Sequence, residues 1–363
     1  EQTGLNLFGM CIVFRSDNRM NPWRTRMQHL ALARYACILL ATLGMDSVTG
    51  YARSDREAQT ISYSNLEDAE VRKHIDGRYK GYRDRAYRFY YQNHKADGDY
   101  LNYGRNRRFE DTGLIKLDGN GFPMVRYGSS QHYNPVTLAQ FALTMHGRYV
   151  NGDETLLAPF LKAADFLRSR QDEDGGLRYD FAYKHAQTEY KPGWLSGMAQ
   201  GQAMSVFARA YHVTRDSTYL NAGRLAHRIL SAPIAEGGLM TTLRDLDESL
   251  ADYLFFEEYV TEPDSYTLNG YIFTLLGLYD WGCLTGDQVA TKQFHDGVAS
   301  LRKILHCYDL DGRSAYDLSH LTNPGRMPYI NRVYHGIHIY LLHALNSIVD
   351  EPVFRQYEAK WNE

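Results

Sequence analysis

The chain has 363 residues, a formal net charge of −3, 44% hydrophobic residues and 23% charged residues, which is an ordinary globular composition. These values exclude disordered, collagen-like and disulfide-rich miniprotein classes, and the small net charge argues against a protein that binds nucleic acid over its whole surface. Tyrosine is unusually frequent, with 29 residues against 15 phenylalanines. Because tyrosine combines an apolar face with a hydroxyl, the excess fits a sugar-binding or acid–base surface and a tyrosine-rich core rim equally well.

Two features bear on the cellular compartment, the cysteines and the most apolar stretch. The four cysteines form no CxxC pair, so we expect buried thiols rather than a zinc or redox site: Cys11, Cys37, Cys283 and Cys307. The stretch Leu30–Met45 is too short to span a membrane and is interrupted by Arg34. We expect an amphipathic or buried helix there, no membrane span and a soluble protein, with the cytoplasm favoured and the compartment otherwise open.

The segment Val71–Phe109 is strongly basic and rich in tyrosine. It holds 11 Lys/Arg against four Asp/Glu, a net charge of +7, together with seven tyrosines. Basic groups interleaved with aromatic rings favour a polyanion, either an acidic polysaccharide or a nucleic acid. A solvated face of a helix or hairpin would give the same pattern, so both interpretations stay open.

The hydrophobic pattern changes near Pro135. Residues 46–130 show little sustained periodicity, and turn signals at Asp97-Gly98-Asp99 and Asp118-Gly119-Asn120-Gly121 predict short strands and loops. We therefore predict an N-terminal helix and a basic β- and loop-rich segment at 1–130, followed by a helical domain at 131–363. In that domain apolar residues recur at helical spacing over Leu138–Tyr149, Leu156–Leu167, Met198–His212, Leu220–Ile229, Leu268–Tyr279, Val289–Leu305 and His335–Ile348.

A weak internal repeat links these helices. Asp-bearing turns precede the helices that begin near Leu156 and Leu220, and a third copy runs from Tyr279 to Asp287. The connection at residues 171–176 reads Gln-Asp-Glu-Asp-Gly-Gly, which resembles the turns between inner and outer helices of α/α toroids. We therefore predict a mainly α fold, an α/α toroid of helical hairpins. Active sites in that architecture lie at the end of the inner ring, but the fold does not decide the chemistry.

An acidic and aromatic segment stands just before a predicted helix. Adjacent Glu257 and Glu258 precede Tyr259, and Asp264 or Ser265 is placed to cap the helix. A carboxylate pressed against aromatic rings and a second carboxylate has a raised pKa, which suits a general acid or base. A solvated acidic loop would also explain the segment.

Two further segments combine tyrosine with histidine. Tyr316 and His320 follow a glycine turn, and Tyr334 shares a helix face with His338, at i,i+4, beside His335. Such groups can move protons, although packing between inner helices explains them equally well. The three histidines could hold zinc, but no other ligand cluster accompanies them, and no phosphate loop, nucleotide fingerprint, HExxH or GxSxG motif is present. We therefore predict no metal and no cofactor.

A series of motifs resembles the glucuronyl C5-epimerases, which convert D-glucuronate to L-iduronate within heparan-type polysaccharides. The similarity covers about residues 122–363 in chain order. Its segments are Gln171-Asp172-Glu173 with Gly175-Gly176, Pro192-Gly193-Trp194, Met198–Ala203, Glu257-Glu258-Tyr259 with Ser265, Leu268-Asn269-Gly270, Leu276–Asp280, Tyr316-Asp317-Leu318 with His320, Tyr334-His335 with His338, and Pro352-Val353-Phe354 with Trp361.

The resemblance implies an isomerase that removes the C5 proton of a glucuronate residue and returns it on the opposite face of the ring. It places Glu258 and Tyr334 as the two acid–base groups, while Tyr259 and Tyr316 bind the carboxylate or share proton transfer. The expected partner is an acidic, heparosan-like polysaccharide and not a nucleic acid, and a homodimer stays open. Substrate contacts are implied for Asn269, His320, His335, His338, Arg126, Tyr127 and Arg332.

The chain departs from the family pattern in two places. The animal enzymes carry a β-sandwich after the helix that corresponds to Leu138–Tyr149, whereas here Tyr149 is followed closely by Leu156, which indicates a compact form. The family's Tyr-Asp-Leu-Arg-His motif has Ser319 in place of its arginine. Arg332 or Arg126 would then have to supply the cation that binds a sugar carboxylate or sulfate.

Three other functions are compatible with these residues. A polysaccharide lyase would abstract the same C5 proton and then expel the C4 oxygen, leaving an unsaturated uronate. A glycosidase would use two carboxylates for hydrolysis and release reducing ends. A non-catalytic protein would bind acidic polysaccharide or nucleic acid through Val71–Phe109, in a salt-sensitive manner and without turnover.

Overall fold

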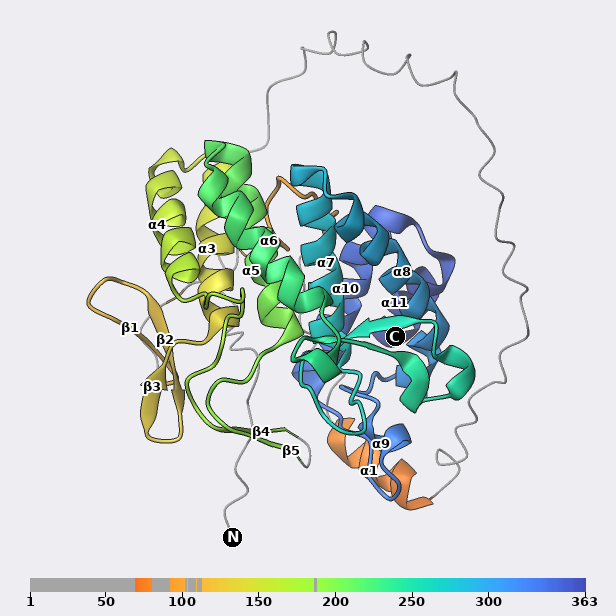
Figure 1. Ribbon diagram of the computed structural model, residues 1–363. Helices are drawn as coiled ribbons and strands as arrows, with labels where there is room; N and C mark the ends of the chain where they lie inside the picture. The colour runs from red at the N-terminus through yellow and green to blue at the C-terminus, as the bar shows by residue number, and fades with distance from the viewer. Residues whose placement is uncertain (1–68, 80–91, 102, 104–108, 110–112, 186–187) are drawn as a thin grey trace, which may run out of the picture. The chain divides into compact units, whose positions relative to one another are not determined.

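The computed structural model describes residues 69–79, 92–101, 103, 109, 113–185 and 188–363, and their helices pack in two layers (Figure 1). The inner helices, which contact one another in this order, are α3 (Pro135–Val150), α5 (Gly197–Thr214), α7 (Leu268–Thr285) and α10 (Arg332–Val349). Each is paired with an outer helix, namely α4 (Leu157–Ser169), α6 (Ser217–Ser231), α8 (Gln288–Ile304) and α11 (Pro352–Asn362). These helical hairpins form an arc of an α/α toroid, so the prediction of a mainly α toroid is confirmed.

Two of the three Asp-bearing turns of the sequence repeat are helix caps, and Asp153 at the third makes no side-chain cap bond. The Asp216 carboxylate accepts a hydrogen bond from the backbone N of Thr218, at 2.8 Å, at the start of α6. The Asp287 carboxylate likewise accepts from the backbone N of Val289 and of Ala290 at the start of α8. Such caps satisfy N–H groups that have no partner within the helix, which explains why α6 and α8 begin close to their predicted starts.

Glycine allows α5 and α7 to approach backbone to backbone. A Cβ atom on Gly277 would lie 2.1 Å from the carbonyl oxygen of Gly201, and one on Gly201 would lie 2.6 Å from Cα of Thr274. Neither space admits a methyl group. Because both helices run in the same direction, this close contact also fixes their N-terminal ends side by side.

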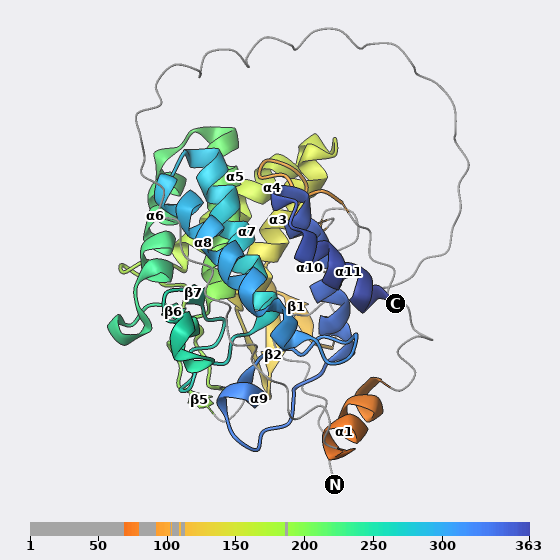
Figure 2. The same ribbon diagram turned by 90° about the vertical axis from the view of Figure 1, so that its right-hand side faces the viewer.

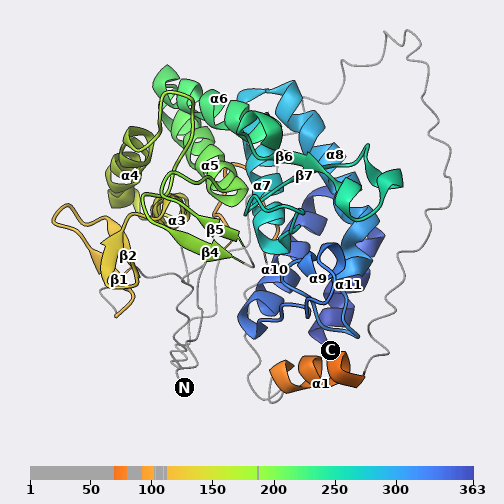
Figure 3. The same cartoon turned by 60° about the horizontal axis from the view of Figure 1, so that its bottom comes forward.

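Three small antiparallel sheets and a short helix lie at one end of the helical layers, as the different views agree (Figures 1, 2 and 3). The first sheet contains β1 (Ile115–Leu117), β2 (Pro123–Tyr127) and β3 (Ser130–His132). The predicted turn at Asp118 connects β1 to β2, since its carboxylate accepts the backbone N–H groups of Asn120 and Phe122. The other elements are β4 (Tyr183–His185) with β5 (Thr188–Tyr190), β6 (Met240–Thr242) with β7 (Leu254–Phe256), and α9 (Ser319–Thr322).

The predictions for the first 130 residues are only partly covered by the described residues. The expected helix at Leu30–Met45 and most of the basic segment lie outside them. Within that segment α1 (Ala69–Tyr79) is a helix rather than a strand or loop, and its Val71 and Ile75 pack against Leu310, Ala315 and Ile330. In the part of the chain that the structure describes, no helix has the length and apolar character needed to cross a bilayer.

The cysteine prediction holds at one of the two positions that can be inspected. Cys307 is buried, in the short 3-10 turn that follows α8. Cys283 is exposed, so the expectation of a buried thiol is wrong there. It lies in the last turn of α7, where burial fades and the following Leu284 and Thr285 are only half-buried. Cys11 and Cys37 lie outside the described residues.

Candidate active site

The N-terminal ends of the inner helices meet the loops that carry the predicted catalytic residues. The backbone N of Gly197, the first residue of α5, donates to the carbonyl of Glu257 at 2.9 Å. The backbone N of Leu268, which begins α7, donates to the carbonyl of Tyr316 at 3.0 Å. Segments far apart in sequence are therefore joined at one end of the helical layers, where the positive ends of the helix dipoles favour an anion.

Glu257 organises the loop before α7. Its side chain is fully buried, with one carboxylate oxygen accepting from the backbone N of Tyr266 at 2.7 Å and the other accepting from the Ser265 hydroxyl at 3.1 Å. The predicted helix cap is therefore wrong. Ser265 is turned to Glu257, and Asp264 accepts from the Thr241 hydroxyl, whereas the N-cap position belongs to Thr267, which makes no side-chain cap bond.

Glu258 is a buried carboxyl group without a cation beside it. Only 3% of the residue is exposed, and none of the described Lys, Arg or His side chains forms an ion pair with it. The Asn269 amide donates to its Oε2 at 3.3 Å, and Gly270 leaves room for it, since a Cβ there would lie 2.1 Å from the same oxygen. Burial raises the pKa of Glu258 to about 8, although hydrogen bonds from Tyr259, the Gly270 backbone and Asn269 oppose that rise. The raised pKa expected for this segment is thus borne out.

Three of the predicted tyrosines lie next to one another. The rings of Tyr316 and Tyr334 meet edge to face, with centroids 4.6 Å apart, and the hydroxyl of Tyr259 approaches that of Tyr316. Burial first, and then the charge of Glu258, raise the pKa of Tyr259 and of Tyr316 well above the ordinary value. Both phenols therefore keep their protons at neutral pH and can donate hydrogen bonds.

The β4–β5 hairpin adds two side chains that the sequence analysis missed. His185 stacks on Tyr259 with ring centroids 4.1 Å apart, and the Tyr183 ring lies 5.7 Å from the same tyrosine. The Nε2 atom of His185 lies 3.5 Å from a carboxylate oxygen of Asp317. No motif marks this hairpin, and its only sequence signal is that aromatic and histidine side chains recur on alternate residues.

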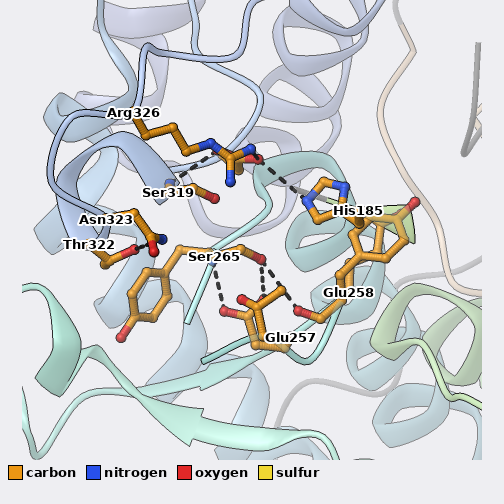
Figure 4. A network of polar contacts seen from close by, with 12 residues as sticks. His185, Glu257, Glu258, Ser265, Ser319, Thr322, Asn323 and Arg326 are labelled. Atoms are coloured by element: carbon orange, nitrogen blue, oxygen red, sulfur yellow. Dashed lines mark hydrogen bonds and ion pairs between the residues drawn. The ribbon is translucent and has the colours of Figure 1, made fainter. Parts of the chain in front are cut away.

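A polar group surrounds Asp317, immediately after Tyr316 (Figure 4). Its buried carboxylate accepts from the backbone N of Ser319 at 3.1 Å and has the guanidinium of Arg326 at 3.9 Å. Burial by itself raises the pKa of Asp317, but the hydrogen bond and charge of His185, followed by the charge of Arg326, hold it below the ordinary value. His320 of the same loop is also buried, and burial lowers its pKa to about 4.

Two of the predicted substrate-binding histidines pack within the protein. His335 accepts from the backbone N of Ser314 at 3.0 Å, and its other ring nitrogen lies 3.1 Å from the carbonyl oxygen of Trp361. His338 lies 2.7 Å from the Ser314 hydroxyl. The pair therefore ties α10 to the preceding loop and to α11, and both ring nitrogens of His335 are already occupied.

The remaining residues predicted to contact substrate differ in how far their side chains are exposed to solvent. Arg126 is exposed on β2, and Tyr127 beside it stacks on Phe181 with centroids 3.9 Å apart. Arg332 is the half-buried first residue of α10. Their contacts with a substrate stay predictions. Among the described residues no group of three or more His, Cys, Asp or Glu side chains is arranged to hold a metal ion.

The family model described as the D-glucuronyl C5-epimerase C-terminus matches residues 171–363, which is more than half of the chain. The chain belongs to this family. The matched range contains every member of the cluster described above, from the β4–β5 hairpin to Tyr334, whereas the first sheet, α3 and α4 precede it.

Relatives of this epimerase family member are found in an animal and an archaeon. A D-glucuronyl C5-epimerase of Caenorhabditis elegans is 31% identical over 217 residues, covering 56% of this chain and 34% of that protein. An uncharacterized protein of Methanocaldococcus jannaschii is 30% identical over 188 residues, covering 51% of this chain and 56% of that protein. The chain thus spans a third to just over half of the length of these relatives.

Solved structures of two family 76 glycoside hydrolases are more distantly similar. One, from a bovine Bacteroides thetaiotaomicron strain, has a TM-score of 0.43 and 12% identity and covers 63% of this chain and 47% of its own. The other, a mannosidase of Bacteroides thetaiotaomicron, has a TM-score of 0.42 and 12% identity and covers 66% and 62%. At this distance neither bears on the activity of the chain.

Proposed function

We propose that this member of the epimerase family is a polysaccharide D-glucuronyl C5-epimerase that converts D-glucuronate to L-iduronate in a heparosan-like chain. One observation carries the proposal beyond family membership. Glu258 is a buried carboxyl group with a pKa of about 8 and no ion pair to any described residue, and it lies among the tyrosines Tyr259, Tyr316 and Tyr334. A group that titrates near neutral pH is suited to taking and returning protons.

The reaction needs an acid–base group on each face of the sugar ring. In the proposed mechanism Glu258 and Tyr334 are these groups: one removes the C5 proton, and the electron pair of the C–H bond moves into an enolate formed with the carboxylate. The other then donates its proton to C5 from the opposite face, which forms the new C–H bond. Each group regains its starting protonation state through exchange with solvent.

The intermediate carries an additional negative charge, which the site must stabilise. Tyr259 and Tyr316 are protonated at neutral pH, so their hydroxyls are suited to donating hydrogen bonds to the developing enolate oxygens. The low exposure of the whole cluster strengthens such interactions, because water does not screen them. The N-terminal ends of α5, α7 and α10 carry partial positive charge from their helix dipoles, which also stabilises the negative intermediate.

The test is incubation of unsulfated heparosan with the protein in heavy water, followed by NMR. An epimerase introduces deuterium at C5 of the uronate residues and produces iduronate, while the chain length is unchanged. Unsaturated chain ends would replace this proposal with the lyase, and new reducing ends would replace it with the glycosidase. Binding without exchange or cleavage would indicate the non-catalytic alternative.

A further inference from the structure

Arg326 is a half-buried cation whose hydrogen-bonding groups are almost unused. Its side chain is 18% exposed, and its one interaction with a described residue is the approach of the guanidinium to Asp317 Oδ2 at 3.9 Å. An arginine that hydrogen-bonds a carboxylate does so at about 2.7–2.9 Å. Asp317 therefore lowers the electrostatic cost of placing Arg326 here but leaves its five N–H donors available to another anion.

Unpartnered polar atoms surround the same arginine. The hydroxyl of Ser319 and the ring nitrogens of His320 are buried and have no side-chain hydrogen-bond partner among the residues that the structure describes, and only the Asp317 backbone approaches the His320 ring. The charge of Arg326 acts on the ring of His320, so the two lie close together. Figure 4 shows the Arg326 side chain extending past Ser319 toward His185. Buried polar atoms without partners are costly, and their grouping beside an unused guanidinium points to a ligand that supplies oxygen atoms.

The position of this group fits the carboxylate of the reacting sugar. Asp317 and Tyr316 are consecutive, and His185 contacts both the ring of Tyr259 and the Asp317 carboxylate, so Arg326 is connected to the tyrosines around Glu258 through Asp317 and His185. In a uronate the carboxylate carbon is bonded directly to C5. A group that holds the carboxylate must therefore lie within a few ångströms of the groups that exchange the C5 proton.

We propose that Arg326, together with Ser319 and His320, binds the carboxylate of the uronate residue whose C5 proton is exchanged, and thereby selects uronic acids over neutral sugars. This inference rests on the proposed function. It gives Arg326 the role that the sequence analysis assigned to Arg332 or Arg126. Figure 4 shows this arginine, seven residues further along the chain, beside the small Ser319 side chain.

The experiment compares equilibrium binding of two polymers, heparosan and heparosan whose carboxyl groups have been reduced to alcohols. Both lack sulfate, so a difference between them reports the carboxylate alone. Wild-type protein should bind heparosan more tightly than the reduced polymer. Arg326→Gln should weaken heparosan binding by about 10- to 100-fold and abolish the preference, because a hydrogen-bonded charge pair is lost. Arg148→Gln, which removes the same charge from an exposed position at the C-terminal end of α3, should retain the preference.

A second variant pair separates carboxylate binding from simple neutralisation of Asp317. If Arg326 only compensates the buried Asp317 charge, the double variant Asp317→Asn with Arg326→Gln should recover the wild-type preference, which would overturn the inference. If Arg326 binds the carboxylate, the double variant stays as weak as Arg326→Gln. Arg326→Lys should keep part of the preference that Arg326→Gln loses, because lysine retains the positive charge but lacks the planar guanidinium that can donate two parallel hydrogen bonds.

The proposed function and this inference fail in different ways. Wild-type protein that exchanges C5 deuterium while Arg326→Gln keeps full heparosan preference would overturn the inference and leave the function intact. Wild-type protein that shows no exchange, with a carboxylate preference that Arg326→Gln abolishes, would overturn the function and still support the carboxylate subsite.

Discussion

The two ends of the inner helices bury charge in opposite ways. At the C-terminal end, Asp280 of α7 is fully buried and accepts from Arg209, at 2.6 Å, and from Ser205, at 2.7 Å, while His94 lies 2.7 Å from its other oxygen. At the N-terminal end, Glu258 is almost as deeply buried but has only neutral hydrogen-bond donors. The two carboxyl groups are about 15–18 Å apart along the helix axes.

The partners of each carboxyl group decide its pKa. Burial raises the pKa of Asp280, but the charges of Arg209 and His94 and their hydrogen bonds more than compensate, so that its pKa is lowered. Burial raises the pKa of Glu258 to about 8, because among the described residues only hydrogen bonds from Tyr259, Gly270 and Asn269 oppose it. A paired buried carboxylate holds elements together: Arg209 also donates to the carbonyl of Lys95 and so attaches residues 92–101 to α5 and α7. An unpaired one is available for proton transfer.

The largest expected effect is on catalysis at the N-terminal end. Glu258→Gln keeps the shape of the side chain but removes the titrating group, and Tyr334→Phe removes a single hydroxyl. Each should lower the rate of C5 exchange by about 10²–10⁴-fold while leaving the thermal unfolding transition close to that of wild type. If the two groups act on opposite faces, each variant should lose exchange from one epimer more than from the other. Wild-type rates in either variant would remove that residue from the mechanism.

The next effect is on stability at the C-terminal end. Asp280→Ala leaves Arg209 buried without its partner, so the free energy of unfolding should fall by about 3–5 kcal/mol in denaturant titrations. The matched control is Glu248→Ala, whose ion pair with Arg244 is exposed and which should change stability by no more than about 0.5 kcal/mol. Equal effects of the two variants would contradict the structural role assigned to the buried cluster.

The pH dependence of exchange should follow Glu258. For the epimer from which Glu258 removes the proton, Glu258 must be deprotonated, so kcat/KM should rise about tenfold per pH unit below a midpoint near 8 and then level off. Asn269→Ala removes a donor that favours the carboxylate form, so it should move this midpoint upward by about one unit. A midpoint that stays in place or moves down would show that Asn269 does not stabilise the charged form.

The same raised pKa has a consequence for stability. Because folding raises the pKa of Glu258 from 4.5 to about 8, the folded protein binds this proton more tightly than the unfolded chain does. The contribution of the Glu258 proton to the free energy of unfolding is therefore complete below about pH 4.5 and is lost as the pH rises through about 8. Glu258→Gln should be relatively more stable than wild type at pH values above 8, as measured by denaturant titration. A difference in unfolding free energy between the two proteins that does not change with pH would contradict the raised pKa of Glu258.

The smallest expected effect concerns an exposed ion pair. Lys292 and Asp296 form an i,i+4 pair on the solvent face of α8. Lys292→Ala should lower the free energy of unfolding by only about 0.3–0.5 kcal/mol, and less at high salt, because solvent screens the pair. A loss comparable to that of Asp280→Ala would remove the distinction between buried and exposed pairs on which the comparison depends.

Sequence patterns predicted the helices and the core of the site because both depend on local signals. Helical periodicity locates α5 to α8, Asp caps mark the starts of α6 and α8, and the adjacent Glu258 and Tyr259 indicate a carboxyl group among aromatic rings. Arg326 and His185 were missed because they reach Asp317 only through the folding of two unrelated loops. The partnership of Asp280 with Arg209, 71 residues apart, has no local pattern either. The packing of His335 and His338 against the Ser314 loop and α11 was not predicted, because sequence cannot tell which face of α10 packs on α11.

The most direct test of this account is a carbon-13 NMR titration of the Glu side-chain carboxyl groups, with the Glu258 signal assigned as the one missing from Glu258→Gln. The account predicts that this signal titrates near pH 8, while labelled Asp280 stays ionised over the same range. A Glu258 signal that titrates in the ordinary range, near 4.5, would contradict the claim that an unpaired buried carboxyl group sets the chemistry at this end of the helices.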